Sequence, residues 1–396
     1  MTADTKGFQK DLYEEMKSRI KEDDESVPYL YNGYYYITRF ETGKDYPIYS
    51  RKRGSLEAKE EILFDCNEMS IGHAYFKLGG LSISPDNNFV SFGMDTVGRR
   101  IYTIQIKNLA TGEILRDKIE NATGSSVWAN DNKTLFYTKQ DEVTLRSDKV
   151  FKHKLDTDSS SDVLVFHEKD DTFDVSVGKE KSRKYILIGS GSTLTTEYRT
   201  LNADNPDGKF VVFQKRVRGL EYSISHFGDS FYIMTNKDKA TNFKLMKTSE
   251  NATAKENWTE VIPHRDDVLL EDIEIFSNYL VVEERSNGLN HIRIMPWSGE
   301  GEYYLPFESE TYSAGTTTNV DFDTEILRYS YQSLATPASV IDFNMRTKEK
   351  EVKKEQQVLG GKFNKNDYIE ERVWATATDG TKVPISMVYK KGLKKD

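Results

Sequence analysis

Short strand-like segments recur along most of this chain, and the turns between them return at nearly constant spacing. The strand-like runs are rich in aromatic and β-branched residues and are bounded by Gly, Asn, Asp or Ser. From Gly112 onward, successive repeating turns are about 47, 49, 45, 46 and 48 residues apart. This period is typical of a four-stranded propeller blade. An all-β, seven-bladed β-propeller is therefore predicted from seven such turns, at Gly54, Thr111-Gly112, Asp158-Ser159, Asp207-Gly208, Ala252, Ser298-Gly299 and Thr347-Lys348.

Other all-β folds also use many short strands. A large β-sandwich or two stacked barrels would fit the strand content, but neither requires a regular period near 47 residues. Similar tight turns at residues 84–87 and 129–132 occupy corresponding places in successive repeats. The spacing therefore favours the propeller.

The two ends of the chain depart from the repeat. Apolar residues at helical spacing predict a helix over residues 8–20. Residues 361–396 contain two predicted strands, 368–374 and 383–389, and two strands do not make an independent domain. We therefore expect the propeller to end at residue 360 and a further domain, cut off at its start, to begin in residues 361–396.

Composition excludes some classes of function. The net charge is −9 and the pI is near 5.4, which argues against a general nucleic-acid binder. No apolar run approaches the ~20 residues needed to span a bilayer, and the N-terminus lacks the apolar core of a signal peptide. We expect no membrane partner and a cytoplasmic location. The single cysteine, Cys66, cannot form an intramolecular disulfide and is predicted to be a buried structural thiol.

Residues that could carry chemistry are scarce. No serine has the Gly-x-Ser-x-Gly context of a hydrolase nucleophile, and residues 189–192 are better explained as a turn. The six histidines lack local metal-ligand spacing and the sequence has no Walker-type phosphate loop, so no metal or other cofactor is expected. Glu168, Asp170 and Asp171 could suggest a metal, but an acidic turn before a strand is the commoner explanation. The residues alone predict a binding or gating propeller.

A family resemblance extends this reading. The stretches that carry it are 27–34 with 46–49, 79–87, 127–131, 143–145 with 150–153, 168–173, 281–289, 329–333 with Thr336-Pro337, and 377–384. In this order, over nearly the whole chain, they resemble the oligopeptidase B branch of the prolyl oligopeptidase family of serine peptidases.

The resemblance implies a propeller that caps an α/β-hydrolase domain and limits access to short peptides. It also implies that residues 1–26 are a helical remnant of that hydrolase domain, that residues 27–360 are the propeller, and that residues 361–396 are the truncated start of the C-terminal hydrolase segment. The hydrolase domain would be the propeller's partner, and oligopeptides cleaved after Arg or Lys would be the substrates. The catalytic triad would lie beyond Asp396, so no catalytic residue is assigned and this chain alone is predicted to be inactive. The resemblance also implies that the first and last blades, expected in residues 34–66 and 311–358, close the ring without exchanging a strand.

The same resemblance suggests residues that face the hydrolase domain. Arg100 matches a propeller arginine at the interdomain cleft, with a solvated strand-end arginine as the alternative. Arg146 and Glu168 are weaker candidates for the same gating role. An acidic residue expected slightly earlier in such enzymes falls at about Ala74, and this departure argues against assigning any particular charged latch. The rival function is a non-catalytic propeller that serves as a protein-interaction platform.

Overall fold

A computed structural model describes residues 5–393 of the chain. It divides into two compact units: residues 66–265 form one, and residues 1–65 with 266–396 form the other. Nearly all regular structure within the described residues is antiparallel β-sheet, as the strand pattern predicts. No helix of that part of the chain has the length and apolar character needed to cross a membrane.

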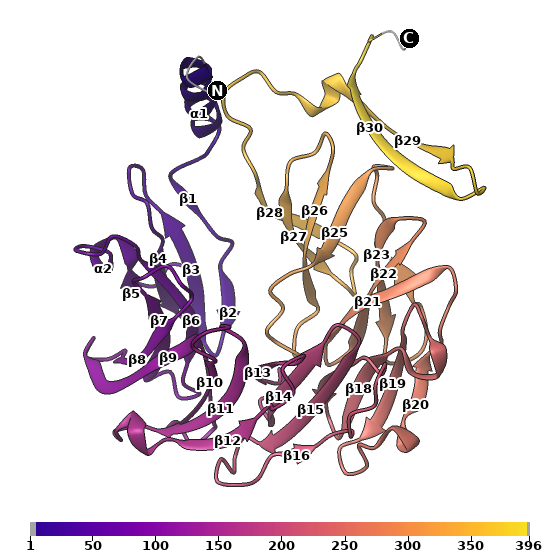
Figure 1. Cartoon of the computed structure of the whole chain (residues 1–396). Helices are drawn as coiled ribbons and strands as arrows, with labels where there is room; N and C mark the ends of the chain where they lie inside the picture. The colour runs from indigo at the N-terminus through magenta and orange to yellow at the C-terminus, as the bar shows by residue number, and fades with distance from the viewer. Residues whose placement is uncertain (1–4, 394–396) are drawn as a thin grey trace. The chain divides into compact units, whose positions relative to one another are not determined.

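The unit formed by residues 66–265 contains three sheets after the short helix α2 (Cys66–Met69) (Figure 1). A seven-stranded sheet is made of β6 (Lys77–Ile83), β7 (Phe89–Asp95), β8 (Tyr102–Asn108), β9 (Ile114–Trp128), β10 (Thr134–Gln140), β11 (Ser147–Lys154) and β12 (Val163–His167). A four-stranded sheet follows, with β13 (Asp174–Lys179), β14 (Tyr185–Ser192), β15 (Thr195–Asn202) and β16 (Val211–Val212). The third contains β17 (Tyr222–Phe227), β18 (Ser230–Thr235), β19 (Lys244–Ser249) and β20 (Thr259–Ile262).

The seven-stranded sheet contains two four-strand repeats that share β9. The first half of this 15-residue strand pairs with β8, from Lys107↔Ile114 to Tyr102↔Ala122. Its second half pairs with β10, from Lys139↔Ala122 to Leu135↔Trp128. Strand β9 is therefore both the last strand of one repeat and the first strand of the next.

The other unit contains three further sheets, a hairpin and a helix (Figure 1). The first sheet comprises β1 (Asp24–Glu25), β2 (Tyr29–Tyr31), β3 (Tyr34–Phe40), β4 (Ile48–Arg53) and β5 (Glu60–Asp65). The second comprises β21 (Val268–Ile275), β22 (Tyr279–Ser286), β23 (Leu289–Pro296) and β24 (Tyr303–Tyr304). The third comprises β25 (Tyr312–Thr316), β26 (Ile326–Ser333), β27 (Ser339–Asn344) and β28 (Lys350–Glu355). The helix is α1 (Lys6–Ser18), and the hairpin is β29 (Tyr368–Thr376) with β30 (Lys382–Lys390).

The repeating turns of the sequence occupy one equivalent place in these sheets. Each lies in the connection between the third and the fourth strand of a repeat, from Gly54 between β4 and β5 to Thr347-Lys348 between β27 and β28. The period near 47 residues therefore measures one repeat of four antiparallel strands.

The core lies between neighbouring sheets, and its pattern explains the most apolar runs in the sequence. Strand β14 shows the reason. Its Ile186 and Ile188 pack in clusters with side chains of β10 and β11, whereas Leu187 packs in a cluster with side chains of β18. Successive side chains of a strand point to opposite faces. A strand covered on both faces is therefore apolar at every position instead of at alternate ones.

Close backbone contact between β6, β7 and β9 depends on glycine. A Cβ placed on Gly80 would lie 1.9 Å from the carbonyl oxygen of Gly124, and one on Gly93 would lie 2.6 Å from the Cα of Gly124. A side chain at either position would force the strands apart. The single cysteine, Cys66, is buried at the start of α2, as predicted.

Side chains connect the first and last sheets of the unit formed by residues 1–65 and 266–396. Each sheet takes its strands from one continuous segment, so neither borrows a strand from the other. Arg328 Nη1 donates to the carbonyl oxygen of Pro28 at 2.8 Å, and Lys354 Nζ lies 2.7 Å from Asp24 Oδ2. These two contacts are made by side chains, and no strand of one sheet is paired with a strand of the other.

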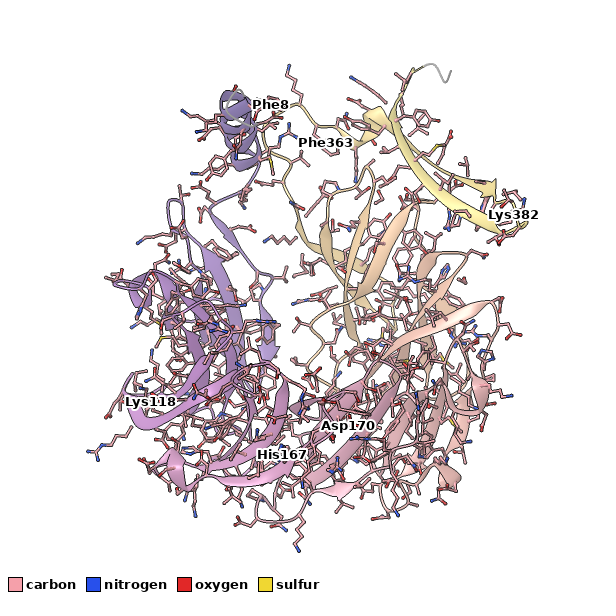
Figure 2. All side chains as sticks on the ribbon, in the orientation of Figure 1. Phe8, Lys118, His167, Asp170, Phe363 and Lys382 are labelled. Carbon is pink, nitrogen blue, oxygen red and sulfur yellow. The ribbon has the colours of Figure 1, made fainter. Side chains whose placement is uncertain are left out.

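Both ends of this unit expose apolar side chains. The predicted helix at 8–20 is present as α1, and none of its residues is buried; Phe8 is 66% exposed (Figure 2). The predicted strands at 368–374 and 383–389 are present as β29 and β30. Glu370 anchors the hairpin because its carboxylate accepts hydrogen bonds from Ser309, Thr311 and the backbone amide of Ala335, at 2.8 to 3.1 Å.

Candidate functional site

The three residues singled out from the sequence lie on connections at one end of their repeats. Arg100 lies between β7 and β8, Arg146 between β10 and β11, and Glu168 between β12 and β13. Antiparallel strands alternate in direction, so the connection after a second strand and the connection after a fourth strand meet at the same end of a sheet. All three residues belong to the unit formed by residues 66–265.

Arg100 closes a turn that Asp95 organises. The buried Asp95 carboxylate accepts hydrogen bonds from the backbone amides of Val97, Gly98 and Arg100 at 2.8 to 2.9 Å. Arg100 has a left-handed backbone (φ 59°), and its carbonyl oxygen accepts a hydrogen bond from the Gln140 side chain at 2.9 Å. Its side chain is exposed, and within residues 5–393 no hydrogen bond or ion pair engages the guanidinium. The turn thus leaves this charge available to another surface.

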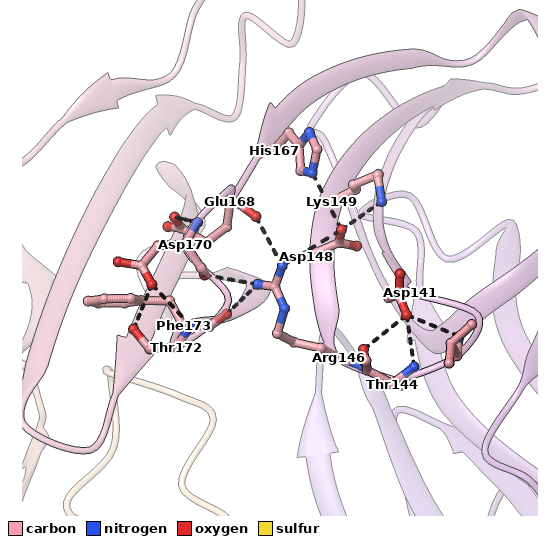
Figure 3. Close-up of polar contacts among 11 residues, drawn as sticks. Asp141, Thr144, Arg146, Asp148, Lys149, His167, Glu168, Asp170, Thr172 and Phe173 are labelled. Carbon is pink, nitrogen blue, oxygen red and sulfur yellow. Dashed lines mark hydrogen bonds and ion pairs between the residues drawn. The ribbon is translucent and has the colours of Figure 1, made fainter.

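Arg146 holds the loop at residues 168–173 in place. Its Nη1 donates to the carbonyl oxygens of Asp170 and Phe173 at 3.2 and 2.6 Å, and its Nη2 donates to that of Glu168 at 3.3 Å (Figure 3). One guanidinium therefore satisfies three backbone acceptors of a single loop. The planar fork of arginine suits this role better than the single ammonium of lysine.

A buried carboxylate, Asp148, supports the same loop from the neighbouring strand. Its Oδ2 lies 2.6 Å from Lys149 Nζ, 3.4 Å from His167 Nε2 and 4.0 Å from Arg146 Nη2 (Figure 3). The Asp148 carbonyl oxygen also accepts a hydrogen bond from the Glu168 amide at 2.8 Å. The charges of Lys149 and Arg146 offset the cost of burying this carboxylate.

Glu168 turns its carboxylate toward the next sheet. Its Oε2 lies 2.5 Å from Arg216 Nη2, and its Oε1 accepts a hydrogen bond from the Asp170 amide at 3.1 Å. The Arg216 guanidinium also lies 3.7 Å from the centre of the Phe173 ring. Burial alone would raise the pKa of Glu168, but Arg216 and the Asp170 amide lower that pKa below its usual value. Glu168 is therefore held as a carboxylate that links two sheets.

The chemistry of this cluster is structural support for a loop. Asp170 accepts hydrogen bonds from the Thr172 amide and hydroxyl at 3.0 and 2.7 Å, as in an acidic turn. The carboxylates of Glu168 and Asp170 thus already have donors. Another histidine of this unit, His153, lies between two aspartates, but its side chain is fully buried and out of reach of a substrate.

Sequence reasoning missed the partners that position these residues. A signal existed for Asp95, because Asp followed three residues later by Gly is typical of a side-chain-capped turn. A second signal lies in the repeat itself: Glu168 and Arg216 are 48 residues apart, which is about one period. Corresponding positions of adjacent sheets are separated by one repeat, so the period identifies where partners should be sought.

Comparison with known proteins extends across the whole chain. Residues 1–356 match the family described as prolyl oligopeptidase, N-terminal beta-propeller domain. Dipeptidyl aminopeptidase BI of Pseudoxanthomonas mexicana is 40% identical over 100% of this chain and 56% of the relative. Protease 2 of Moraxella lacunata is 30% identical over 96% of this chain and 55% of the relative. The chain thus spans a little over half the length of these relatives.

Solved structures of oligopeptidase B are also similar to this chain over nearly its whole length. Oligopeptidase B from Leishmania major superposes with a TM-score of 0.91 at 32% identity, covering 99% of this chain and 57% of that structure. Oligopeptidase B from Trypanosoma brucei, in a closed form with covalently bound antipain, gives a TM-score of 0.90 at 29% identity, with 99% and 57% coverage.

Proposed function

Because the chain belongs to the prolyl oligopeptidase family of serine peptidases, as its β-propeller portion, we propose that it gates a cytoplasmic oligopeptidase that cleaves short peptides after Arg or Lys. The chemistry, acyl transfer by a Ser–His–Asp triad, resides in an α/β-hydrolase domain. The propeller contributes sterically: it excludes folded proteins and admits flexible oligopeptides. The 396-residue chain on its own is inactive, because no nucleophile is assigned within it.

The observation that carries this proposal is the likeness to two oligopeptidase B structures over 99% of the chain. The exposed apolar surface at the ends of the chain supports it. In the hairpin, Trp374, Val383, Ile385 and Val388 are each 41 to 46% exposed. Apolar surface of this kind, together with the exposed apolar side chains of α1, suits coverage by a further domain. We propose that this domain is the hydrolase.

We further propose that the propeller has seven blades. This count treats the seven-stranded sheet as two blades that share β9, alongside the five sheets of four or five strands. The proposed boundaries are 1–26 for the helical segment of the hydrolase domain, 27–360 for the propeller and 361–396 for the start of the C-terminal hydrolase segment.

The three candidate gating residues have different roles in this proposal. The exposed guanidinium of Arg100 makes a charged contact across the cleft with the hydrolase domain. Arg146 and Glu168 act indirectly, because they fix the loop at 168–173 at the same end of the repeats. The loop then presents a constant surface to the hydrolase domain.

A second candidate specificity is favoured by one comparison. The relative that shares 40% identity carries the name dipeptidyl aminopeptidase, which describes removal of dipeptides from free amino termini. The same propeller would then gate an exopeptidase instead of an endopeptidase. Peptide substrates with a blocked amino terminus distinguish the two, because only the endopeptidase cleaves them.

The proposal is tested with the chain alone and with a chimera. Residues 1–396 are joined to the C-terminal part of the Pseudoxanthomonas mexicana relative. We expect the chimera to cleave short peptides but not a folded protein, and the chain alone to show no turnover sensitive to a serine-directed inhibitor. A folded chimera that cleaves neither blocked nor free peptides would favour the rival interaction platform. Turnover by the chain alone would refute the assignment of the chemistry to the hydrolase domain.

A further inference from the structure

A basic cavity lies in the unit formed by residues 66–265, and none of the residues of the loop at 168–173 lines it. It has a volume of about 590 Å³ and is lined by residues from 217–220, 236–241 and 255–258. The first two segments are the connection before β17 and the connection between β18 and β19. They lie at the same end of that sheet, by the strand-direction argument given for Arg146 and Glu168.

The charge of this cavity is opposite to that of the chain. Four basic residues line it, against two acidic ones, whereas the whole chain carries a net charge of −9. One of the two acidic residues, Asp238, is already engaged, with its Oδ2 2.7 Å from Lys237 Nζ and 3.2 Å from Lys244 Nζ. The cavity therefore keeps an excess of positive charge.

The remaining three basic side chains have no partner in the described part of the chain. No hydrogen bond or ion pair within residues 5–393 engages the side-chain nitrogens of Arg218, Lys239 or Lys255. Elsewhere in the same unit, cations such as Lys152 and Lys184 pair with carboxylates at 2.7 and 2.5 Å. Three unpaired cations around one cavity make a site for an anion.

The backbone of the cavity is fixed in an unusual conformation. Asp238 and Lys239 are consecutive left-handed residues, with φ of 60° and 64°, and side chains other than glycine seldom adopt this region. Asn236 holds the loop against the opposite wall: its side-chain amide donates to the Gly219 carbonyl oxygen and to Glu221 Oε1, each at 3.0 Å. Strained backbone that is held in place in this way clusters at ligand sites.

We propose that this cavity binds an oxyanion, and that the anion is the C-terminal carboxylate of a peptide. Arg218 offers a planar fork that suits the two oxygens of a carboxylate, while Lys239 and Lys255 add charge from the other two segments. The buried Trp258 contributes an apolar wall suited to the last side chain of the peptide. The choice of a peptide as the source of the anion rests on the proposed function, whereas the anion site itself does not.

The test is a binding titration of the 396-residue chain by calorimetry at low salt. The probes are trialanine with a free carboxylate, trialanine amide and inorganic phosphate. We expect the free carboxylate to bind at least tenfold more tightly than the amide, and phosphate to compete with it. Equal binding of carboxylate and amide would overturn the proposal. Phosphate binding without carboxylate binding would overturn the peptide as the source.

Variants locate the site within the chain. Arg218→Gln and Lys239→Gln should each weaken carboxylate binding about tenfold, while Glu256→Gln should strengthen it. Lys209→Gln, which removes an exposed charge of the same unit outside the cavity, is the matched control and should bind like wild type. Wild-type affinity in Lys239→Gln would contradict the assignment. Because the assay measures no hydrolysis, its outcome is separate from that of the chimera experiment.

Discussion

Buried His153 gives the sharpest test of the energetics of this fold. Its Nε2 lies 2.8 Å from Asp117 Oδ1 and its Nδ1 lies 2.7 Å from Asp162 Oδ1, and all three side chains are almost completely buried. The Tyr137 hydroxyl donates to the other oxygen of Asp162 at 2.8 Å. Two carboxylates that flank one imidazole favour its protonated form, in which both ring nitrogens are donors.

The expected effect follows from the pKa of His153. Burial alone would lower that pKa, but hydrogen bonds and charge from Asp117 and Asp162 raise it from 6.5 to about 9. Each tenfold change in proton affinity corresponds to ~1.4 kcal/mol, so protonated His153 contributes about 3 kcal/mol to the free energy of unfolding. The folded pKa is the higher one, so this stability is fully present below pH 6.5 and is lost as the pH rises through 9.

The variant His153→Gln isolates this contribution. Glutamine has one donor group and no charge, so it resembles neutral histidine between the two carboxylates. We expect the variant to be about 3 kcal/mol less stable than wild type at pH 6 and nearly equal to it at pH 10. Denaturant unfolding of the full chain, followed by the fluorescence of buried tryptophans such as Trp128, measures the difference at each pH.

A second buried histidine supplies the control. Burial lowers the pKa of His226, despite its contact with Glu250 at 3.1 Å. The contribution of His226 to the free energy of unfolding is therefore lost as the pH falls below 6.5. The loss of stability caused by His226→Gln should then stay constant between pH 6.5 and 10. A cost of His153→Gln that is equally constant, or that grows with pH, would refute the assignment of a protonated His153.

Other predictions concern the strands, the site and the junction of the first and last sheets. Gly80→Ala should destabilise the chain by about 3 kcal/mol in denaturant unfolding, because the new Cβ would clash with the Gly124 carbonyl oxygen. Gly112→Ala is the control and should destabilise the chain by only about 1 kcal/mol, because open space surrounds that position. Arg146→Met should weaken the loop at 168–173 by about 2 kcal/mol, seen as faster amide exchange confined to that loop; exchange unchanged there would contradict its role. Arg100→Ala should change the melting of the chain by less than about 0.5 kcal/mol yet lower peptide turnover by the chimera; a large loss of stability would make the residue structural. Lys354→Met should speed amide exchange in residues 34–66 and 311–358 relative to 121–267, and uniform protection would show that this junction is no weaker than the others.

Local interactions made much of the fold predictable from the sequence. A strand pairs with the next strand through a short turn, so turn residues and alternating side chains carry the necessary information. The helix at 8–20, the hairpin at 368–389 and the repeating turns are each found where the pattern predicts them. The shared strand β9 was not predictable, because its two halves pair with different neighbours without a turn between them.

The candidate site was predicted only in part. Arg146 and Glu168 were named from the sequence, but their joint support of one loop was not, and neither was the role of Arg216. The basic cavity was also not anticipated, because its charges come from three separate segments of the sequence.

The sequence by itself determined the strands, their period of about 47 residues and the family to which the chain belongs. Contacts between neighbouring repeats have the same spacing, as in Ser82 with Trp128, Glu168 with Arg216, and Ser277 with Asp323, which are 46 to 48 residues apart. The tertiary structure alone decided which side chains, one repeat apart in the sequence, contact each other. Such contacts depend on the twist of each sheet and on the bulges that shift its register, and these are set by packing between sheets instead of by neighbours along the chain.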